Sequence, residues 1–112
     1  MPIENWSDTI ALVELQDDPA FTDDMNALID QLSEQEDLDV VLNFASVNYV
    51  NSSNIAKLLR VRKIQISNGR QLRLCSVNTH VWGLLLVTGL DKVFTFFDDV
   101  SMGLASVQLE RE

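Results

Sequence analysis

Strand-like and helix-like segments alternate along this chain, and the alternation restricts the folds it can adopt. β-Branched and apolar runs predict strands at residues 9–15, 39–44, 71–77 and 93–96, while apolar spacing and capping residues predict helices at about 21–32, 51–68, 79–87 and 98–108. Neighbouring parallel strands need a long crossover connection, which is usually a helix. The order therefore predicts an α/β fold with a parallel or mostly parallel sheet covered by helices.

The chain has the size of one domain. Its 112 residues can bury a single core without metal or disulfide support, and we expect one domain over residues 1–112. Cys75 is the only cysteine, so no internal disulfide can form, which favours a reducing compartment. The longest apolar run, 81–87, is far shorter than the roughly 20 residues of a membrane span, and the N-terminus lacks the basic and apolar regions of a signal peptide. We therefore predict a cytoplasmic protein without a membrane span.

Acidic and basic residues are sorted along the sequence. No Asp or Glu lies between Val40 and Leu90, although the net charge is −9, and residues 1–39 hold twelve acids and no Lys or Arg. Six of the eight basic residues fall in the acid-free stretch: Lys57, Arg60, Arg62, Lys63, Arg70 and Arg73. Sorted charge steers and orients partners, so we predict a binding surface centred on the segment that begins at Asn51. A pI near 4.3 argues against direct binding to nucleic acid, which depends on neutralising phosphates.

Motifs for catalysis or metal binding are not evident in the sequence. The single His80 and the single Cys75 have no acid near them, and such a pair does not make a metal site. The four glycines are isolated from one another, so no Gly-rich phosphate loop exists. The carboxylates lie in polar or turn-rich contexts rather than as a buried pair suited to acid–base catalysis. We therefore predict a protein that is not an enzyme and has no metal or cofactor.

A polar cluster, Asn51-Ser52-Ser53-Asn54, opens the predicted second helix. Asn and Ser accept hydrogen bonds from the free N–H groups of a helix start, so capping explains one or two of these residues. The same end of a helix also stabilises a phosphate, and a phosphoserine would add about −1.5 to −2 charges close to Lys57 and Arg60. The residues alone leave two interpretations open, which are pure capping and a regulated recognition site.

This cluster and the segments around it resemble the STAS family, specifically the anti-sigma factor antagonists. The family pattern is a buried strand, a short loop, and then Asp–Ser–Ser/Thr–Gly–Leu opening a helix. Residues 40–44 are similar to that strand, 49–55 to the motif, 60–63 to the following basic helix, 71–75 to the next strand, 88–94 to the turn into the last strand, and 97–99 to the start of the final helix. Asn51 and Asn54 stand at the positions of the motif Asp and Gly.

The resemblance implies a STAS fold, with a mostly parallel sheet of four to five strands covered by four helices. It also implies a bacterial regulator of transcription that switches partners. The unmodified antagonist binds an anti-sigma factor that is a serine kinase, the kinase uses its own bound ATP to phosphorylate Ser52, and a serine phosphatase reverses the step. The residues expected to bind this partner are Asn51, Ser53, Asn54, Lys57, Arg60 and Lys63. The alternative is a STAS scaffold that is not phosphorylated, within a signalling or lipid-transport complex.

Apolar spacing predicts which sides of the later helices face the core. In the second helix the expected apolar side consists of Ile55, Leu58, Leu59 and Ile66, and the separate basic face consists of Lys57, Arg60 and Lys63. In the third helix the positions expected in the core, which match family core positions, are Val81, Leu84 and Thr88. Asp98 is the expected cap of the final helix.

Two large apolar residues of the third helix are left over by this assignment. Trp82 and Leu86 are spaced i, i+4 and therefore share one face. An exposed apolar patch usually marks a protein contact, which would give a homodimer or a second partner. The other interpretation is that this helix is buried under the N-terminal segment that contains Trp6.

Overall fold

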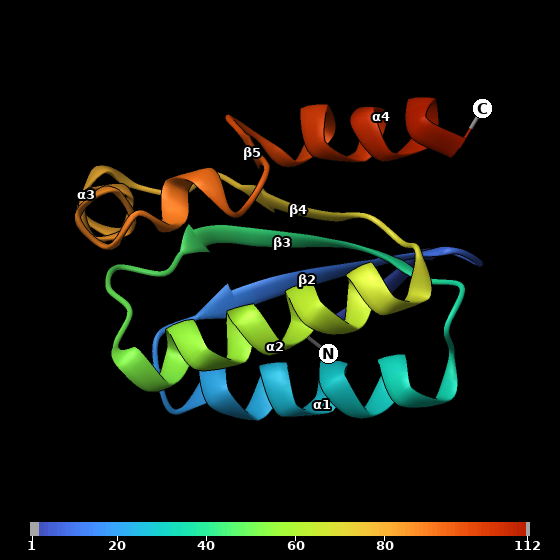
Figure 1. Cartoon of the computed structure of the whole chain (residues 1–112), viewed down its shortest axis with the longest axis horizontal. Helices are drawn as coiled ribbons and strands as arrows, with labels where there is room; N and C mark the ends of the chain where they lie inside the picture. Colours follow the sequence, from blue (N-terminus) through green and yellow to red (C-terminus); the bar gives the residue numbers. More distant parts are fainter. Residues whose placement is uncertain (1–2, 112) are drawn as a thin grey trace.

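Five strands form one mixed sheet in the order β1-β2-β3-β4-β5, and helices cover both of its faces (Figure 1). The computed structural model describes residues 3–111, so Met1, Pro2 and Glu112 of the expected domain 1–112 lie outside the described residues. The elements are β1 (Ile3–Ser7), β2 (Ile10–Gln16), α1 (Ala20–Glu34), β3 (Asp39–Ser46), α2 (Ser52–Asn68), β4 (Leu72–Cys75), α3 (Thr79–Thr88), the 3-10 turn η1 (Leu90–Lys92), β5 (Phe96–Phe97) and α4 (Val100–Arg111). The predicted α/β fold, with a mostly parallel sheet and four helices, is confirmed.

The strands β2, β3, β4 and β5 pair in parallel, and β1 runs antiparallel beside β2. The sequence does not predict β1, because its three central residues, Glu4, Asn5 and Trp6, are all exposed and show no apolar alternation. This strand forms at the edge of the sheet, where the partner strand supplies the hydrogen bonds and little burial is needed. The crossover order of the remaining strands follows the predicted alternation.

The sheet separates two apolar layers of unequal size. Ala11, Val13 and Leu15 of β2 face the larger layer under α1 and α2, whereas Ile10 and Leu12 face the smaller layer under α4. This division follows from the two-residue repeat of a strand. Figure 1 shows α1 and α2 side by side on one face of the sheet and α4 on the other. A strand buried on both faces needs an unbroken apolar run, which residues 10–13 of β2 provide.

The side of α2 that faces the core differs from the predicted one. The buried side chains are Asn54, Leu58, Val61 and Gln65. Leu59 and Ile66, which we expected to be buried, are 37% and 60% exposed. Leu58 is buried and Ile55 packs against the core as predicted, but the prediction is wrong for Leu59 and Ile66. Apolar residues surround this helix, so apolar spacing alone does not select one face. Polar side chains with tertiary hydrogen-bond partners occupy two of the core-facing positions instead.

The last strand is shorter and begins later than the predicted 93–96. The Val93 carbonyl accepts a hydrogen bond from Arg62 Nε at 3.0 Å instead of joining a strand ladder. The ladder begins at Thr95, whose carbonyl accepts from the Leu74 N–H at 3.0 Å. Val93 therefore belongs to the turn after η1 and bonds to α2, and the strand starts beyond it.

The last two helices also differ in detail from the prediction. In α3 the buried residues are Val81 and Leu85, whereas Thr88 is exposed and its hydroxyl donates to carbonyls of its own helix. In α4 the cap is Asp99 rather than Asp98, because Asp99 Oδ1 accepts from the Met102 N–H at 2.8 Å. These corrections change which residues of the two helices are buried or act as the cap, and they leave the order of elements unchanged.

Candidate functional site

Ser52 is the first residue of α2, and its side chain is exposed. The preceding Asn51 is the N-cap, and its Oδ1 accepts from the Asn54 N–H at 2.8 Å. In return, Asn54 Oδ1 accepts from the Asn51 N–H at 3.1 Å, which completes a reciprocal capping box. This local arrangement holds the hydroxyl of Ser52 at a helix N-terminus, where free N–H groups and the helix dipole favour negative charge.

A carboxylate from another part of the chain lies beside this helix start. Asp18 Oδ2 accepts from Asn51 Nδ2 at 3.1 Å and from Asn54 Nδ2 at 2.9 Å. Its second oxygen, Oδ1, accepts from the backbone N–H of Thr22 at 2.9 Å and from the Thr22 hydroxyl at 2.7 Å. Asp18 therefore joins the N-terminal ends of α1 and α2. These hydrogen bonds, that of the Thr22 side chain foremost, lower the pKa of Asp18 to about 2.

The loop that leads into α2 is held by the neighbouring carboxylate. Asp17 accepts from the Asn48 backbone N–H and from Asn48 Nδ2, both at 2.8 Å. These two bonds lower the pKa of Asp17. β2 and β3 are parallel neighbours, so their carboxyl ends lie at the same edge of the sheet and the residues after them meet there. The pair of acids after the first predicted strand was the sequence signal for this arrangement.

The residues expected around Ser52 differ in accessibility. Asn51 and Ser53 are exposed, in keeping with a role at a partner surface. Asn54 is only 1% exposed, because its side chain turns inward to Asn51 and Asp18. Asn54 therefore lies in the capping box and bonds to Asp18, rather than on the open surface beside Ser52.

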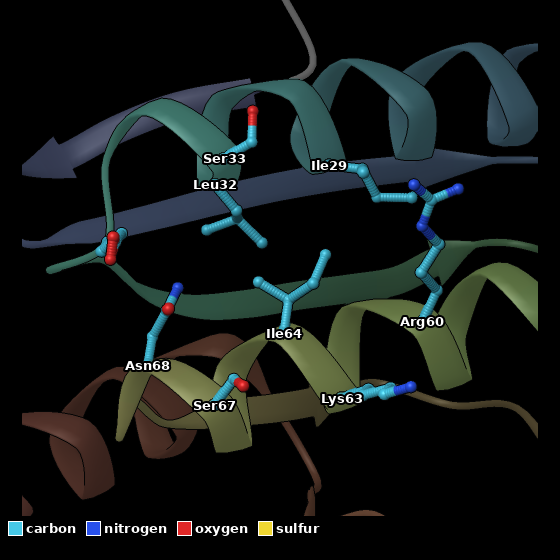
Figure 2. Close-up of a pocket in the computed structure, with 9 residues that line it drawn as sticks. Ile29, Leu32, Ser33, Arg60, Lys63, Ile64, Ser67 and Asn68 are labelled. Atoms are coloured by element: carbon cyan, nitrogen blue, oxygen red, sulfur yellow. The ribbon is translucent and has the colours of Figure 1, made fainter.

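The basic residues of α2 do not gather at the serine. Lys57 Nζ donates to Asn26 Oδ1 of α1 at 3.0 Å. Arg60 and Lys63 are exposed and lie farther along the helix, where they line a groove between α1 and α2 (Figure 2). The groups that surround Ser52 are therefore amides and carboxylates, whereas the cations extend toward the far end of the helix.

Three exposed apolar side chains near this surface were not predicted from the sequence. Tyr49 is 50% exposed in the loop before α2, and Leu59 and Ile66 are exposed on α2 itself. Leu59, Lys63 and Ile66 follow Ser52 by seven, eleven and fourteen residues, so all four share one side of the helix. The outer side of α2 thus carries large apolar residues and a cation in line with Ser52. The sequence signal was the excess of apolar residues on this helix, which exceeds what one core-facing side can bury.

α3 presents the second surface considered from the sequence. Trp82 is half-buried and packs edge-on against Phe96 of β5, with ring centroids 4.9 Å apart. Leu86 and Val87 are 49% and 87% exposed. Trp6 is exposed on β1, at the opposite edge of the sheet from the β5 strand that Trp82 contacts. The interpretation that the N-terminal segment covers α3 is therefore wrong.

The isolated reactive side chains do not form a reactive site. Cys75 is fully buried, and burial raises the pKa of its thiol to about 11. His80 is exposed at the start of α3. Within residues 3–111, no cluster of three or more His, Cys, Asp or Glu side chains could hold a metal ion. Over the same residues, no helix is both long and apolar enough to cross a bilayer.

Known proteins share this arrangement of strands and helices. A proposed anti-sigma factor antagonist from Thermotoga maritima superposes with a TM-score of 0.82 at 19% identity, over 96% of this chain and 93% of that one. RsbS from Moorella thermoacetica, solved as a serine-to-glutamate variant, gives 0.83 at 17% identity, over 99% and 97%. An anti-sigma factor antagonist domain protein from Planctomyces limnophilus gives 0.77 at 18%, over 88% and 91%. The STAS domain family matches residues 18–102, from the Asp18 carboxylate through the serine cluster and into α4, and this chain belongs to that family.

Proposed function

We propose that this chain is a cytoplasmic regulatory domain that binds an anti-sigma factor serine kinase and is released when the kinase phosphorylates Ser52. The observation that carries the proposal is the exposed hydroxyl of Ser52 at the first residue of α2. ATP is bound by the kinase, and a serine phosphatase restores the binding form. This chain acts as substrate and ligand, and it needs no catalytic group or cofactor of its own.

The surroundings of Ser52 supply a physical reason for release. The Asp18 carboxylate bonds to the residues on either side of Ser52 and Ser53, namely Asn51 and Asn54. A phosphate on Ser52 would carry about two negative charges next to this ionised group. Like charge and added bulk at the centre of a contact both oppose binding of a partner that fits the unmodified serine.

The proposed contact extends beyond the serine along α2. Exposed Asn51 and Ser53 flank the hydroxyl, and Arg60 and Lys63 lie along the helix toward its far end. Lys57, which bonds to Asn26, contributes its charge to the same side of the molecule. These cations would attract an acidic rim on the partner and speed its approach. Leu59 and Ile66 would supply apolar contact area between them.

The relatives agree with a role in protein binding. Two structural neighbours are described as anti-sigma factor antagonists, one of them as a proposed one. A third, RsbS, was studied with one serine replaced by glutamate, a substitution that adds negative charge. Their fold supports the proposal, while the kinase and its sigma factor have to be identified by experiment.

Phosphorylation is tested by mass spectrometry of the purified chain after incubation with ATP and a candidate serine kinase encoded by a neighbouring gene. Ser52→Ala should abolish the added phosphate, whereas the matched Ser53→Ala should keep it. Ser52→Asp should weaken kinase binding by at least about tenfold, as expected for a charge placed in a buried polar contact. Labelling of Ser52→Ala at the wild-type level would contradict the assignment of this serine.

The competing candidate is a STAS scaffold that is not phosphorylated, within a signalling or lipid-transport complex. The departures Asn51 and Asn54 from the family Asp and Gly favour it, because they change what a kinase meets at the serine. An unlabelled Ser52 in protein purified from its own cells, together with a stable complex that survives Ser52→Asp, would establish this alternative.

The surface of α3 is a candidate for self-association. The helix carries no Lys, Arg, Asp or Glu, while the whole chain has a net charge of −9. Two copies can approach through an uncharged face without opposing like charges, so we propose a weak homodimer there. Leu86→Glu should shift any dimer to monomer in sedimentation experiments, with a change in unfolding free energy below about 0.5 kcal/mol. A dimer that persists in this variant would exclude α3 as the interface.

A further inference from the structure

A groove of about 620 Å³ runs between α1 and α2 at the end of the helices that lies away from Ser52. Its apolar lining comes from Ile29 and Leu32 of α1, which are 7% and 1% exposed, and from half-buried Ile64 of α2. In Figure 2, Leu32 and Ile64 face one another across the groove, and Ile29 points toward Arg60. A groove between two neighbouring helices is a common binding site for a third helix.

The charges on the two sides of this groove are unequal. Arg60 and Lys63 line it from α2, and Glu36 lines it after the end of α1. Within residues 3–111, neither Arg60 nor Lys63 makes an ion pair, since the ion pairs there use Arg70 and Arg73. In a chain of net charge −9, two exposed cations without a carboxylate partner lie at one place on an apolar groove. Their charge is complementary to an acidic ligand.

We propose that this groove docks an acidic amphipathic helix of a partner protein. Apolar side chains of that helix would pack against half-buried Ile64 and the small exposed part of Ile29, and its carboxylates would face Arg60 and Lys63. Glu36 disfavours a carboxylate at its own end of the groove, so the acids are expected toward one end of the docked segment. This inference rests on the proposed function only in taking the chain to act by binding protein.

The groove shares Arg60 and Lys63 with the contact proposed for the kinase, but its apolar lining lies away from Ser52. Ser52 and Ile64 are twelve residues apart on one helix, which places them about 18 Å apart along its axis. Screening reduces interactions between exposed charges beyond about 8–10 Å at physiological salt. A phosphate at Ser52 would therefore leave the groove largely unaffected, and a partner could stay attached here while the contact at Ser52 is broken.

The test uses two labelled helical peptides of about 18 residues, a length that permits helix formation in isolation. Both carry the same stripe of Leu residues. One has Glu beside the stripe, and its twin has Lys at the same positions. Fluorescence anisotropy with the full chain should show the Glu peptide binding at least about tenfold more tightly than the Lys peptide, with a difference that shrinks as salt rises.

Matched variants locate the binding site. Lys63→Glu should weaken the Glu peptide by about three- to tenfold, whereas Lys92→Glu, which makes the same charge change at another exposed lysine, should have no effect beyond the shift in net charge. Ser33→Trp fills the groove from exposed Ser33 and should weaken binding at least tenfold, while Ser101→Trp on exposed α4 should not.

Several results would overturn the inference. They are equal binding of the two peptides, equal loss in Lys63→Glu and Lys92→Glu, full binding by Ser33→Trp, or no binding of either peptide up to about 1 mM. If the chain self-associates and Ser33→Trp abolishes this self-association, the groove binds a second copy of the chain instead of a partner helix. Ser52→Asp should bind the Glu peptide like wild type, so failure of the phosphoswitch and failure of the groove are separate outcomes.

Discussion

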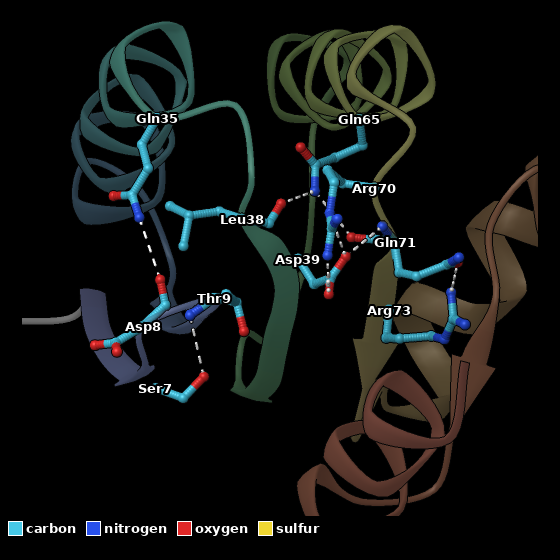
Figure 3. Close-up of polar contacts among 10 residues, drawn as sticks. All are labelled: Ser7, Asp8, Thr9, Gln35, Leu38, Asp39, Gln65, Arg70, Gln71 and Arg73. Carbon is cyan, nitrogen blue, oxygen red and sulfur yellow. Dashed lines mark hydrogen bonds and ion pairs between the residues drawn. The ribbon is translucent and has the colours of Figure 1, made fainter. Parts of the chain in front are cut away.

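Asp39 and Asp18 each fasten one end of α2 to the rest of the molecule, but with different partners. Asp39, at the start of β3, is 1% exposed and forms a two-pronged ion pair with Arg70, at 3.1 Å and 2.9 Å, just after α2 ends. It also accepts from the Gln71 N–H at 2.8 Å, and Gln65 extends the network to the Leu38 carbonyl (Figure 3). Asp18, at the start of α2, is half-buried and bonds only to neutral amide and hydroxyl groups and one backbone N–H.

The two carboxylates therefore have different roles. The Asp39 ion pair stabilises the fold, whereas the hydrogen bonds of Asp18 can rearrange when the charge at Ser52 changes. A buried carboxylate paired with an Arg cannot lose its partner without leaving a charge in the interior. A half-buried carboxylate held by neutral donors can exchange them for water at a smaller cost. The serine lies at the second kind of anchor, where a new charge can change local contacts without unfolding the domain.

The largest expected effect of a substitution at either anchor is the loss of Asp39. Asp39→Ala should lower the free energy of unfolding by about 3 kcal/mol, because it leaves Arg70 and the Gln71 N–H without their acceptor. Urea unfolding followed by circular dichroism measures it. The control Asp30→Ala, at an exposed position of α1, should stay within about 0.5 kcal/mol of wild type. A loss below about 1 kcal/mol for Asp39→Ala would remove the contrast between the two anchors.

An intermediate loss of stability is expected when low pH protonates Asp18. Its folded pKa of about 2 lies below its ordinary value of 3.8, so the unfolded chain takes up the proton first as pH falls. The stability that Asp18 contributes is complete above about pH 4 and is lost between about pH 4 and 2. With allowance for solvent screening, we expect about 1 kcal/mol.

Urea unfolding of wild type and Asp18→Asn at pH 6 and pH 2.5 measures this contribution. The variant should be less stable by about 1 kcal/mol at pH 6 and close to wild type at pH 2.5. A difference between the two proteins that is equal at both pH values would show that the charge of Asp18 does not matter.

The smallest expected effect is the coupling free energy between a charge at Ser52 and the carboxylate of Asp18. Ser52→Asp gains about 0.5 kcal/mol from the helix dipole and loses a similar amount by repulsion from Asp18. It should therefore be nearly neutral in wild type and stabilising by about 0.5 kcal/mol in Asp18→Asn. The double-mutant cycle measures this coupling, and the matched cycle with Asp30→Asn should be additive. Additivity in both cycles would place Ser52 outside the influence of Asp18.

The parts of the fold that could be predicted are those with one clear apolar repeat. The runs in β2 and β3 and the stripe of α1, which is buried at Phe21, Met25, Leu28, Ile29 and Leu32, each allow one arrangement. β1 and the face of α2 could not be predicted, since the first is polar and the second is apolar on several sides. In both cases pairing and packing with distant residues decide the outcome, and local periodicity does not record them.

The position of Ser52 at the start of α2 was determined by the sequence itself, because a capping box acts between residues three apart and needs no tertiary support. The environment of that serine was decided by the tertiary structure. Asp18 is 33 residues before Asn51, and only the parallel pairing of β2 with β3 places its carboxylate at the helix start. The same packing set α1 beside α2 and left Arg60 and Lys63 along a groove. Charge pattern and helix capping depend on residues close together in the sequence. Contacts between distant segments depend on how the apolar faces of helices and strands are buried against one another.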